Sequence, residues 1–512
     1  MFKKVYSTKI NVAATFASSI WLATLNIIFV PVYLNYIGIE TYGLIGVFSS
    51  IQAFVALLDF GLSPTLNREL ARLSALKDKN QEMQDIKRTL EIPNWIGAVF
   101  IALLLSAVAP LISSFWLNPK ELSVETVTAA MIIIGINIAI QFSVNFYTGG
   151  LLGLQKQFLL SLISLICGTL RVVGAFAVLV TVSQTIQAFL IWQGLVAVLQ
   201  VSLLALALRK CLPKSPHKVG FRKDLLSNIW KFAAGITGLT VFDLILVQTD
   251  KVILSRLLNL ETFGYYILAT TISTLATNMI AGSISQAVYP KFSRLVSIQD
   301  EKGLRDLYHR SCQIMSVMLL PVMVIFVLFS YDILLVWTGK ENVALNTYKL
   351  LSLVAVGYGL HGLVWLPHCL QLAHGWTKLA LYSNITAIIF LIPVMIVGVL
   401  RYDAIGGAVV WVILNILYIL TVQIMHRRIL KGDALKWYVE DLAVPLITAT
   451  TVAGIGKMLL PAFQRTRLEG ILYLALISGA TLFFTAFSTR ATRQHLFDIG
   501  DKIFGYRKVL NK

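Results

Sequence analysis

The chain has 512 residues, of which 57% are hydrophobic and only 13% are charged, and its mean hydropathy is +0.77. Soluble proteins carry about 25% charged residues, so this chain lacks the charge needed to cover the surfaces of several soluble domains. The net charge of +18 lies mostly in short segments beside apolar runs, which argues against a nucleic-acid-binding protein. The composition predicts a polytopic membrane protein.

The first apolar run follows the basic N-terminus MFKKVYSTKI and continues to about Val32. This length is too great for the apolar region of a cleaved signal peptide, so we interpret the run as the first membrane span. A membrane-crossing helix needs about 20 mostly apolar residues, and by this criterion the chain contains about fourteen helical spans. The predicted spans centre, in chain order, near Leu22, Phe54, Leu103, Gly135, Leu170, Val196, Leu239, Leu275, Val322, Tyr358, Ile388, Ile413, Val452 and Ile477.

The basic residues alternate between the two sides of the predicted membrane. Most of the 43 Lys and Arg residues lie at the N-terminus, in every second loop and in the C-terminal tail. The positive-inside rule therefore predicts that both termini are cytoplasmic and that the number of spans is even. The longest inside segment, SPTLNRELARLSALKDKNQEMQDIKRTLE, predicts an amphipathic helix with Ser63 as its N-cap and Pro64 in its first turn. We interpret it as a solvated connector on the membrane, with a surface for anionic headgroups as the alternative.

A short motif occurs twice. GIETYG at residues 38–43 follows span one, and NLETFG at residues 259–264 follows span seven. Each motif opens the next span, which ends in a basic inside segment. Because six spans separate the copies, both enter the membrane from the same side. The pattern predicts a parallel repeat about an axis along the membrane normal, an arrangement in which transporters place their substrate between the halves.

Three longer stretches are similar to a known family. They are PVYLNYIGIETYGLIGVFSSIQAFVALLDFGLSPTLNRELA (31–71), QTDKVILSRLLNLETFGYYILAT (248–270) and YDAIGGAVVWVILNILYIL (402–420). In this order they resemble the polysaccharide-transporter branch of the multidrug/oligosaccharidyl-lipid/polysaccharide exporter superfamily, over about the first 430 residues. The chain departs from the family pattern at Asp403, where a glycine is usual.

The resemblance implies an all-α polytopic membrane protein with about 14 transmembrane helices. Two parallel six-helix lobes, residues 1–217 and 218–432, would surround a central cleft. Two additional transmembrane helices and a basic cytoplasmic tail would occupy residues 433–512.

The activity that the resemblance implies is that of a flippase in the bacterial inner membrane. It would move undecaprenyl-pyrophosphate-linked oligosaccharide repeat units of O-antigen, capsule or a similar polysaccharide by alternating access. The implied partners are this lipid-linked substrate, membrane lipids, a coupling ion (H⁺ or Na⁺) and other membrane proteins of polysaccharide assembly.

Other functions are less consistent with the sequence. A multidrug and toxin extrusion antiporter is the main alternative, and it would favour an acidic cleft. A peptidoglycan-precursor flippase would carry arginines in spans one and two, where this chain has neither Arg nor Lys. No P-loop, HExxH motif or nucleotide-binding glycine motif is present, and the outer loops are too short for a catalytic domain. We therefore expect no enzyme, no cofactor and no catalytic residue.

Metal binding is also not expected. The four cysteines form no CxxC pair and no spacing typical of metal ligands, which argues against both a zinc site and a disulfide framework. These cysteines are Cys167, Cys211, Cys312 and Cys369.

Ionisable residues inside spans are costly and are usually functional or paired. Arg171 in span five could bind the pyrophosphate, or it could lock two helices through a salt bridge. Asp243 in span seven could bind the coupling ion, or it could be the partner of Arg171. His361 and His368 lie two turns apart on one face of span ten and could relay protons or pack, and Pro367 could break the helix beside them.

Two further candidates lie nearer the ends of spans. Lys457 in span thirteen could contact a substrate headgroup, or its side chain could extend outward to the membrane surface. Asp59 at the inner end of span two could belong to a substrate gate, or it could cap a helix or pair with Arg68.

Overall fold

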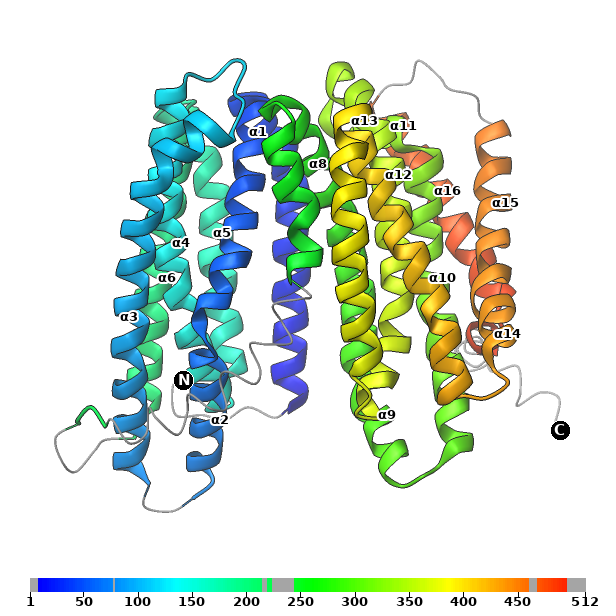
Figure 1. Ribbon diagram of the computed structural model, residues 1–512, viewed down its shortest axis with the longest axis horizontal. Helices are drawn as coiled ribbons and strands as arrows, with labels where there is room; N and C mark the ends of the chain where they lie inside the picture. Colours follow the sequence, from blue (N-terminus) through cyan, green and yellow to red (C-terminus); the bar gives the residue numbers. More distant parts are fainter. Residues whose placement is uncertain (1–7, 77–78, 214–218, 223–243, 460–466, 495–512) are drawn as a thin grey trace. The chain divides into compact units, whose positions relative to one another are not determined.

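The computed structural model describes residues 8–76, 79–213, 219–222, 244–459 and 467–494. All regular secondary structure in these ranges is helical (Figure 1). The chain forms two compact units, Met1–Gly264 and Tyr265–Lys512.

In the first unit, α4 packs against α2, α3 and α6, and α5 packs against α1 and α6 (Figure 1). Its helices are α1 (Thr8–Val55), η1 (Ala56–Asp59), α2 (Leu62–Ser74), α3 (Asn80–Leu111), η2 (Ile112–Trp116), α4 (Val124–Gly153), α5 (Gln157–Thr181), α6 (Ile186–Cys211), helical residues 244–257 and the start of α8 (Leu260–Thr277).

In the second unit, α12 packs against α10, α11 and α13, and α15 packs against α10 and α16. Its helices are the remainder of α8, η3 (Asn278–Gly282), α9 (Ser283–Ser297), α10 (Glu301–Leu328), α11 (Ser330–Thr338), α12 (Glu341–Ala373), α13 (Lys378–Arg428), α14 (Ala434–Lys436), η4 (Trp437–Ala443), α15 (Val444–Leu459) and α16 (Arg467–Ser488).

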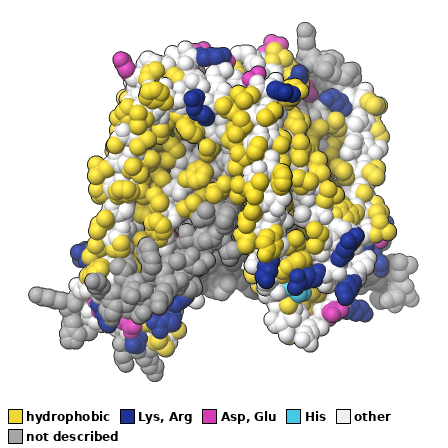
Figure 2. All heavy atoms as spheres, viewed as in Figure 1, with side chains coloured by type: hydrophobic (Ala, Val, Ile, Leu, Met, Phe, Trp, Pro, Cys, Tyr) yellow, Lys and Arg dark blue, Asp and Glu magenta, His cyan; other side chains and the backbone are white. Residues whose placement is uncertain are grey.

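The helices confirm an all-α polytopic membrane protein. In the described ranges, 11 helices are long and apolar enough to cross a membrane. Two of these, Ala14–Asp59 and Lys378–Arg428, each contain a kink and cover two predicted spans. The span predicted near Leu239 lies largely outside the described residues. Hydrophobic side chains form a band along the helices of each unit, and Lys and Arg gather toward the helix ends (Figure 2).

Both kinks have a local backbone cause. In α1, Gly38 has φ 76° and ψ 170°, a conformation that only glycine adopts without strain. The chain therefore turns at the first residue of GIETYG and re-enters as a second helix. In α13, the kink lies at Tyr402 and Asp403, and Asp403 has φ 51°. Asp403 stands where the resembling family usually has glycine, and its positive φ is a backbone conformation that favours glycine.

The segment predicted as a surface connector is instead partly buried. One face of α2 packs into the core of the first unit, through Leu62, Leu66, Leu70 and Leu73. The close approach of α2 to α4 depends on Gly149 and Gly153 of α4. A Cβ at Gly149 would lie 2.6 Å from a carbonyl oxygen of α2, and a Cβ at Gly153 would lie 2.5 Å from another. This spacing of two glycines is a common device for close packing of membrane helices.

The predicted N-cap of this helix is wrong. The cap position is Gly61, at φ 75°, because the chain passes through left-handed conformations at Phe60 and Gly61 before α2 begins. Asp59, which precedes the helix, caps its first turn. The Asp59 carboxylate accepts hydrogen bonds from the backbone N–H of Ser63 at 3.1 Å and from the Ser63 hydroxyl at 2.7 Å.

Candidate functional site

The two copies of the repeated motif contact each other. Both lie in the first unit, where Ile39–Gly43 opens the second half of α1 and Leu260–Gly264 opens α8. A Cβ added to Gly43 would lie 2.5 Å from the carbonyl oxygen of Leu260, and one added to Gly264 would overlap the carbonyl oxygen of Ile39. We call this pairing the corner contact.

The corner contact is reciprocal. Each glycine faces the carbonyl of the residue that stands four positions before the other glycine. Such an exchange of equivalent residues resembles the self-complementary contact at a two-fold axis. The glycines permit it, because any side chain at residue 43 or 264 would meet backbone atoms, which cannot rotate away.

A third segment, the loop at residues 117–122, fastens the corner contact. The Glu40 carboxylate, only 2% exposed, accepts backbone N–H groups of Lys120, Glu121 and Leu122 at 2.5 to 3.1 Å. On the other side, Leu260 N donates to Asn118 O at 3.0 Å. Hydrogen bonds to a charged carboxylate are stronger than a hydrogen bond between neutral backbone groups. The first corner therefore holds the loop more firmly than the second corner does.

The equivalent glutamate of the second corner makes a weaker contact. Glu261 pairs with the Lys120 ammonium at 3.4 Å, and both side chains are substantially exposed to solvent. Exposed ion pairs contribute about 0 to 1 kcal/mol. The two repeats therefore use the same residue type differently, which the sequence repeat alone does not reveal.

Arg171 lies on α5 with a neutral partner. Its Nη2 donates to Gln200 Oε1 of α6 at 2.8 Å, and its Nε is buried without a hydrogen-bond partner among the described residues. No acidic side chain in the described ranges forms an ion pair with it. The proposed partner or ion ligand Asp243 lies outside the described residues.

The two histidines of the predicted relay lie on α12, which continues through Pro367 without a break. The amide of Asn415 donates to the Trp411 carbonyl, so its Oδ1 accepts from His361 Nδ1 at 3.1 Å. His361 also packs against the rings of Trp365 and Trp411. His368 is half-buried on the same helix.

The side chain of Lys457 on α15 reaches the end of α10 within the second unit. Its ammonium donates to the carbonyl of Leu328 at the end of α10 and lies 5.5 Å from the ring centre of Phe329. Both this ammonium and the helix-capping carboxylate of Asp59 therefore have polar contacts within the protein. Arg68, the basic residue predicted as a partner of Asp59, pairs with Glu69 at 2.9 Å.

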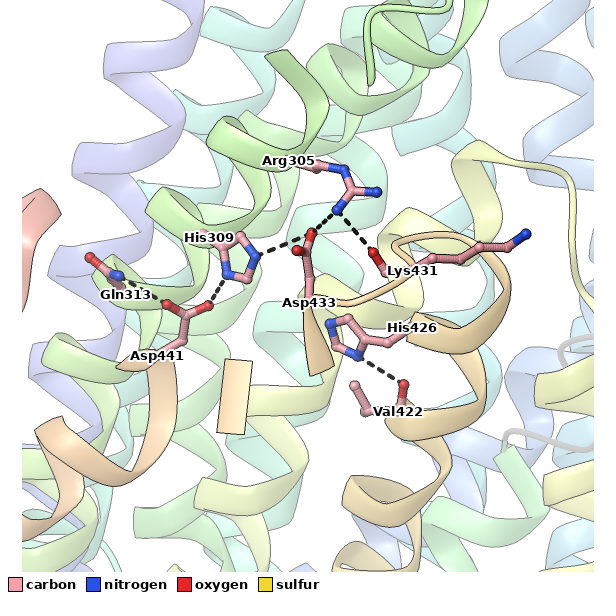
Figure 3. A network of polar contacts seen from close by, with 8 residues as sticks. All are labelled: Arg305, His309, Gln313, Val422, His426, Lys431, Asp433 and Asp441. Carbon is pink, nitrogen blue, oxygen red and sulfur yellow. Dashed lines mark hydrogen bonds and ion pairs between the residues drawn. The ribbon is translucent and has the colours of Figure 1, made fainter. Parts of the chain in front are cut away.

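A polar network in the second unit was missed at the level of sequence (Figure 3). His309 of α10 contacts Asp441 of η4 at 2.5 Å and lies 3.6 Å from Asp433. Arg305 pairs with Asp433 at 2.8 Å. His309 and Gln313 are four residues apart, which places them on one face of a helix, and this spacing was the signal that the sequence offered. The two aspartates follow more than 120 residues later in a basic segment, so the sequence did not connect them with His309.

The chain matches one family of known proteins and a named relative. The family described as "Polysaccharide biosynthesis protein" matches residues 37–343. A Shigella flexneri protein named "Putative O-antigen transporter" is 23% identical over 392 residues, which cover 77% of this chain and 91% of that protein.

Two solved structures share the fold. The first is described as "Lipid II flippase MurJ, inward closed conformation", with a TM-score of 0.67 and 17% identity, and the match covers 94% of this chain and 98% of that one. The second is an inward-facing multidrug resistance MATE family transporter of the MOP superfamily, with a TM-score of 0.63 and 15% identity, covering 83% and 96%.

Proposed function

Because this chain belongs to the polysaccharide biosynthesis protein family, we propose that it is a flippase for lipid-linked oligosaccharides. Its substrate would be an undecaprenyl-pyrophosphate-linked repeat unit of O-antigen, capsule or a similar polysaccharide, moved across the bacterial inner membrane. The observation that carries this proposal is the family match, which includes both corners of the reciprocal contact. The name of the Shigella flexneri relative supports the same substrate class.

The corner contact supports transport by alternating access. We propose that it closes the outer end of the pathway and that it must separate when the substrate leaves. Rocking of two halves about a midplane site is the usual motion in transporters built from repeats. At each glycine the contact pairs backbone with backbone, and the side chains of Leu260 and Ile39 pack beside it. We expect such a contact to open and close as a unit.

Among the proposed substrate residues, Arg171 is the best candidate for the pyrophosphate. Its Nε has no hydrogen-bond partner in the described ranges, whereas Asp59 and Lys457 have polar contacts of their own. A guanidinium binds phosphate oxygens through two parallel N–H groups. Asp243, His361 and His368 remain proposals for ion coupling.

Deletion of this protein in its native bacterium tests the function. We expect surface polysaccharide to disappear and lipid-linked repeat units to accumulate on the cytoplasmic leaflet, with both effects reversed by the wild-type gene. Normal export together with increased sensitivity to cationic drugs would contradict the flippase and favour a drug antiporter.

The orientation is a separate prediction. In an active variant without the four native cysteines, a cysteine at Asn80 should react with a membrane-impermeant maleimide only after cell lysis. A cysteine at Glu125, which is exposed at the start of α4, should react in intact cells. The reason is that the basic residues around Asn80 favour the cytoplasm. Labelling of the Asn80 cysteine in intact cells would reverse the topology.

A further inference from the structure

The guanidinium of Arg428 lies over the indole ring of Trp376, with 4.4 Å between the guanidinium carbon and the ring centre. Trp376 lies in the turn between α12 and α13, and Arg428 is the last residue of α13. Both helices are long and apolar enough to cross a membrane, so this contact, which we call the Trp376–Arg428 stack, lies where two spans end. Tryptophan and arginine at the ends of spans are typical of the lipid headgroup level.

The turn after α12 holds the tryptophan in place. Gly375 has φ 67°, its backbone N–H donates to the Leu372 carbonyl at 2.9 Å, and the backbone N–H of Trp376 donates to the Gln371 carbonyl at 3.0 Å. These two hydrogen bonds around a left-handed glycine form a Schellman motif, which ends α12. The Trp376 side chain is half-buried and packs against the hydrophobic core of the second unit. The ring is therefore a fixed platform for the guanidinium.

The stacked guanidinium keeps hydrogen-bond donors available. A guanidinium that packs over an aromatic face still has N–H groups at its edge, in its own plane. The Arg428 side chain is exposed, and among the described residues no carbonyl or carboxylate accepts a hydrogen bond from it. The first acidic residue after it in the chain, Asp433, is engaged by Arg305 at 2.8 Å. The stack therefore presents an oriented cation to the surroundings of the protein.

The positive charge around the stack is not neutralised in the way it is elsewhere in the chain. Four basic side chains of α2 and α3 form ion pairs with Glu69 or Glu91. At the end of α13, in contrast, Arg427, Arg428 and Lys431 are all exposed, and none of them forms an ion pair with a described acidic side chain. An anionic partner from outside the chain would be electrostatically complementary to this end of the helix.

An exposed apolar stripe on α13 leads to the stack. Leu417, Leu420 and Ile424 are 46%, 58% and 49% exposed, and their spacing places them on the same face of the helix as Arg428. Exposed apolar surface on a membrane-crossing helix is suited to contact with lipid chains. A lipid whose chains lie along this stripe would carry its phosphate at the level of Arg428. The arrangement therefore fits a phospholipid better than a free phosphate ion.

We propose that the Trp376–Arg428 stack binds the headgroup phosphate of an anionic phospholipid whose acyl chains lie along the apolar stripe of α13. The guanidinium offers parallel N–H groups to the phosphate oxygens. Arg427 and Lys431 add a weaker attraction at longer range, which favours a lipid with net negative charge. The occupant is a constituent of the surrounding bilayer, so this inference can fail while the proposed transport function holds.

Native mass spectrometry of the delipidated full-length protein measures the binding of single lipids. With phosphatidylglycerol and phosphatidylcholine of the same acyl chains, we expect the first phosphatidylglycerol to bind about tenfold more tightly. Arg428→Gln should remove this preference. Arg427→Gln is the matched control, because it removes the same charge from a neighbouring exposed residue that contacts no aromatic ring in the described ranges. It should weaken phosphatidylglycerol binding by about twofold or less.

Two substitutions of Trp376 test the platform. Trp376→Phe keeps an aromatic face and should retain most of the preference, whereas Trp376→Leu keeps an apolar side chain without a ring and should lose most of it. Equal affinity of the wild-type protein for the two lipids would overturn the proposal. Equal losses in Arg428→Gln and Arg427→Gln would also overturn it, because they would reduce the effect to general charge attraction. Displacement of the bound lipid by inorganic phosphate would assign the site to a free anion instead.

Discussion

Replacing Gly43 and Gly264 together by alanine should reduce polysaccharide export on the order of tenfold or more. Each new Cβ would meet a backbone carbonyl oxygen of the opposite corner, at Leu260 or Ile39. Overpacking typically costs about 1 to 3 kcal/mol per site, and about 1.4 kcal/mol changes a population tenfold. The closed corner contact should therefore become a minor state.

A distance measurement distinguishes this effect from simple misfolding. Spin labels at exposed Glu125 and Arg256 should report a longer distance in the double alanine variant than in the otherwise wild-type protein. Gly454→Ala provides the matched control, because no atom lies within 4 Å of a Cβ at that position. Unchanged distances together with full export in the Gly43/Gly264 variant would remove the corner contact from the transport cycle.

Replacing Arg171 by alanine should reduce export on the order of 10- to 100-fold while the protein remains in the membrane. A hydrogen bond to a charged group contributes about 1.5 to 3 kcal/mol, and a guanidinium can make two to a pyrophosphate. Arg171→Lys should restore only part of the export, because the ammonium lacks the planar pair of donors.

The hydrogen-bond partner Gln200 offers a paired control. The Arg171 guanidinium lies 2.8 Å from the amide oxygen of Gln200, so Gln200→Glu would place a carboxylate beside it. This carboxylate should compete with the proposed pyrophosphate group and reduce export. Gln200→Met removes the hydrogen bond without adding charge and should leave export nearly intact. Full export in Arg171→Ala, or equal loss in both Gln200 variants, would assign Arg171 a structural role or none.

The amino-acid sequence alone was sufficient to predict the class of the protein and the course of the chain. Membrane spans depend on the local length and hydrophobicity of a segment, so most predicted centres fall in the long apolar helices. The break at Gly38 is also local, because the backbone conformation there favours glycine. The repeated motif likewise indicated where the chain turns.

The partner of each helix face, in contrast, follows only from the packed structure. The amphipathic pattern of α2 did not distinguish a membrane surface from the glycine-lined face of α4, about 85 residues away. The two corners are separated by more than 200 residues. Neither copy of the motif predicts that its glycine faces a backbone carbonyl of the other copy. His309 and Asp441 are 132 residues apart. Such contacts depend on how helices pack in three dimensions, and local periodicity carries no information about the partner of a given face.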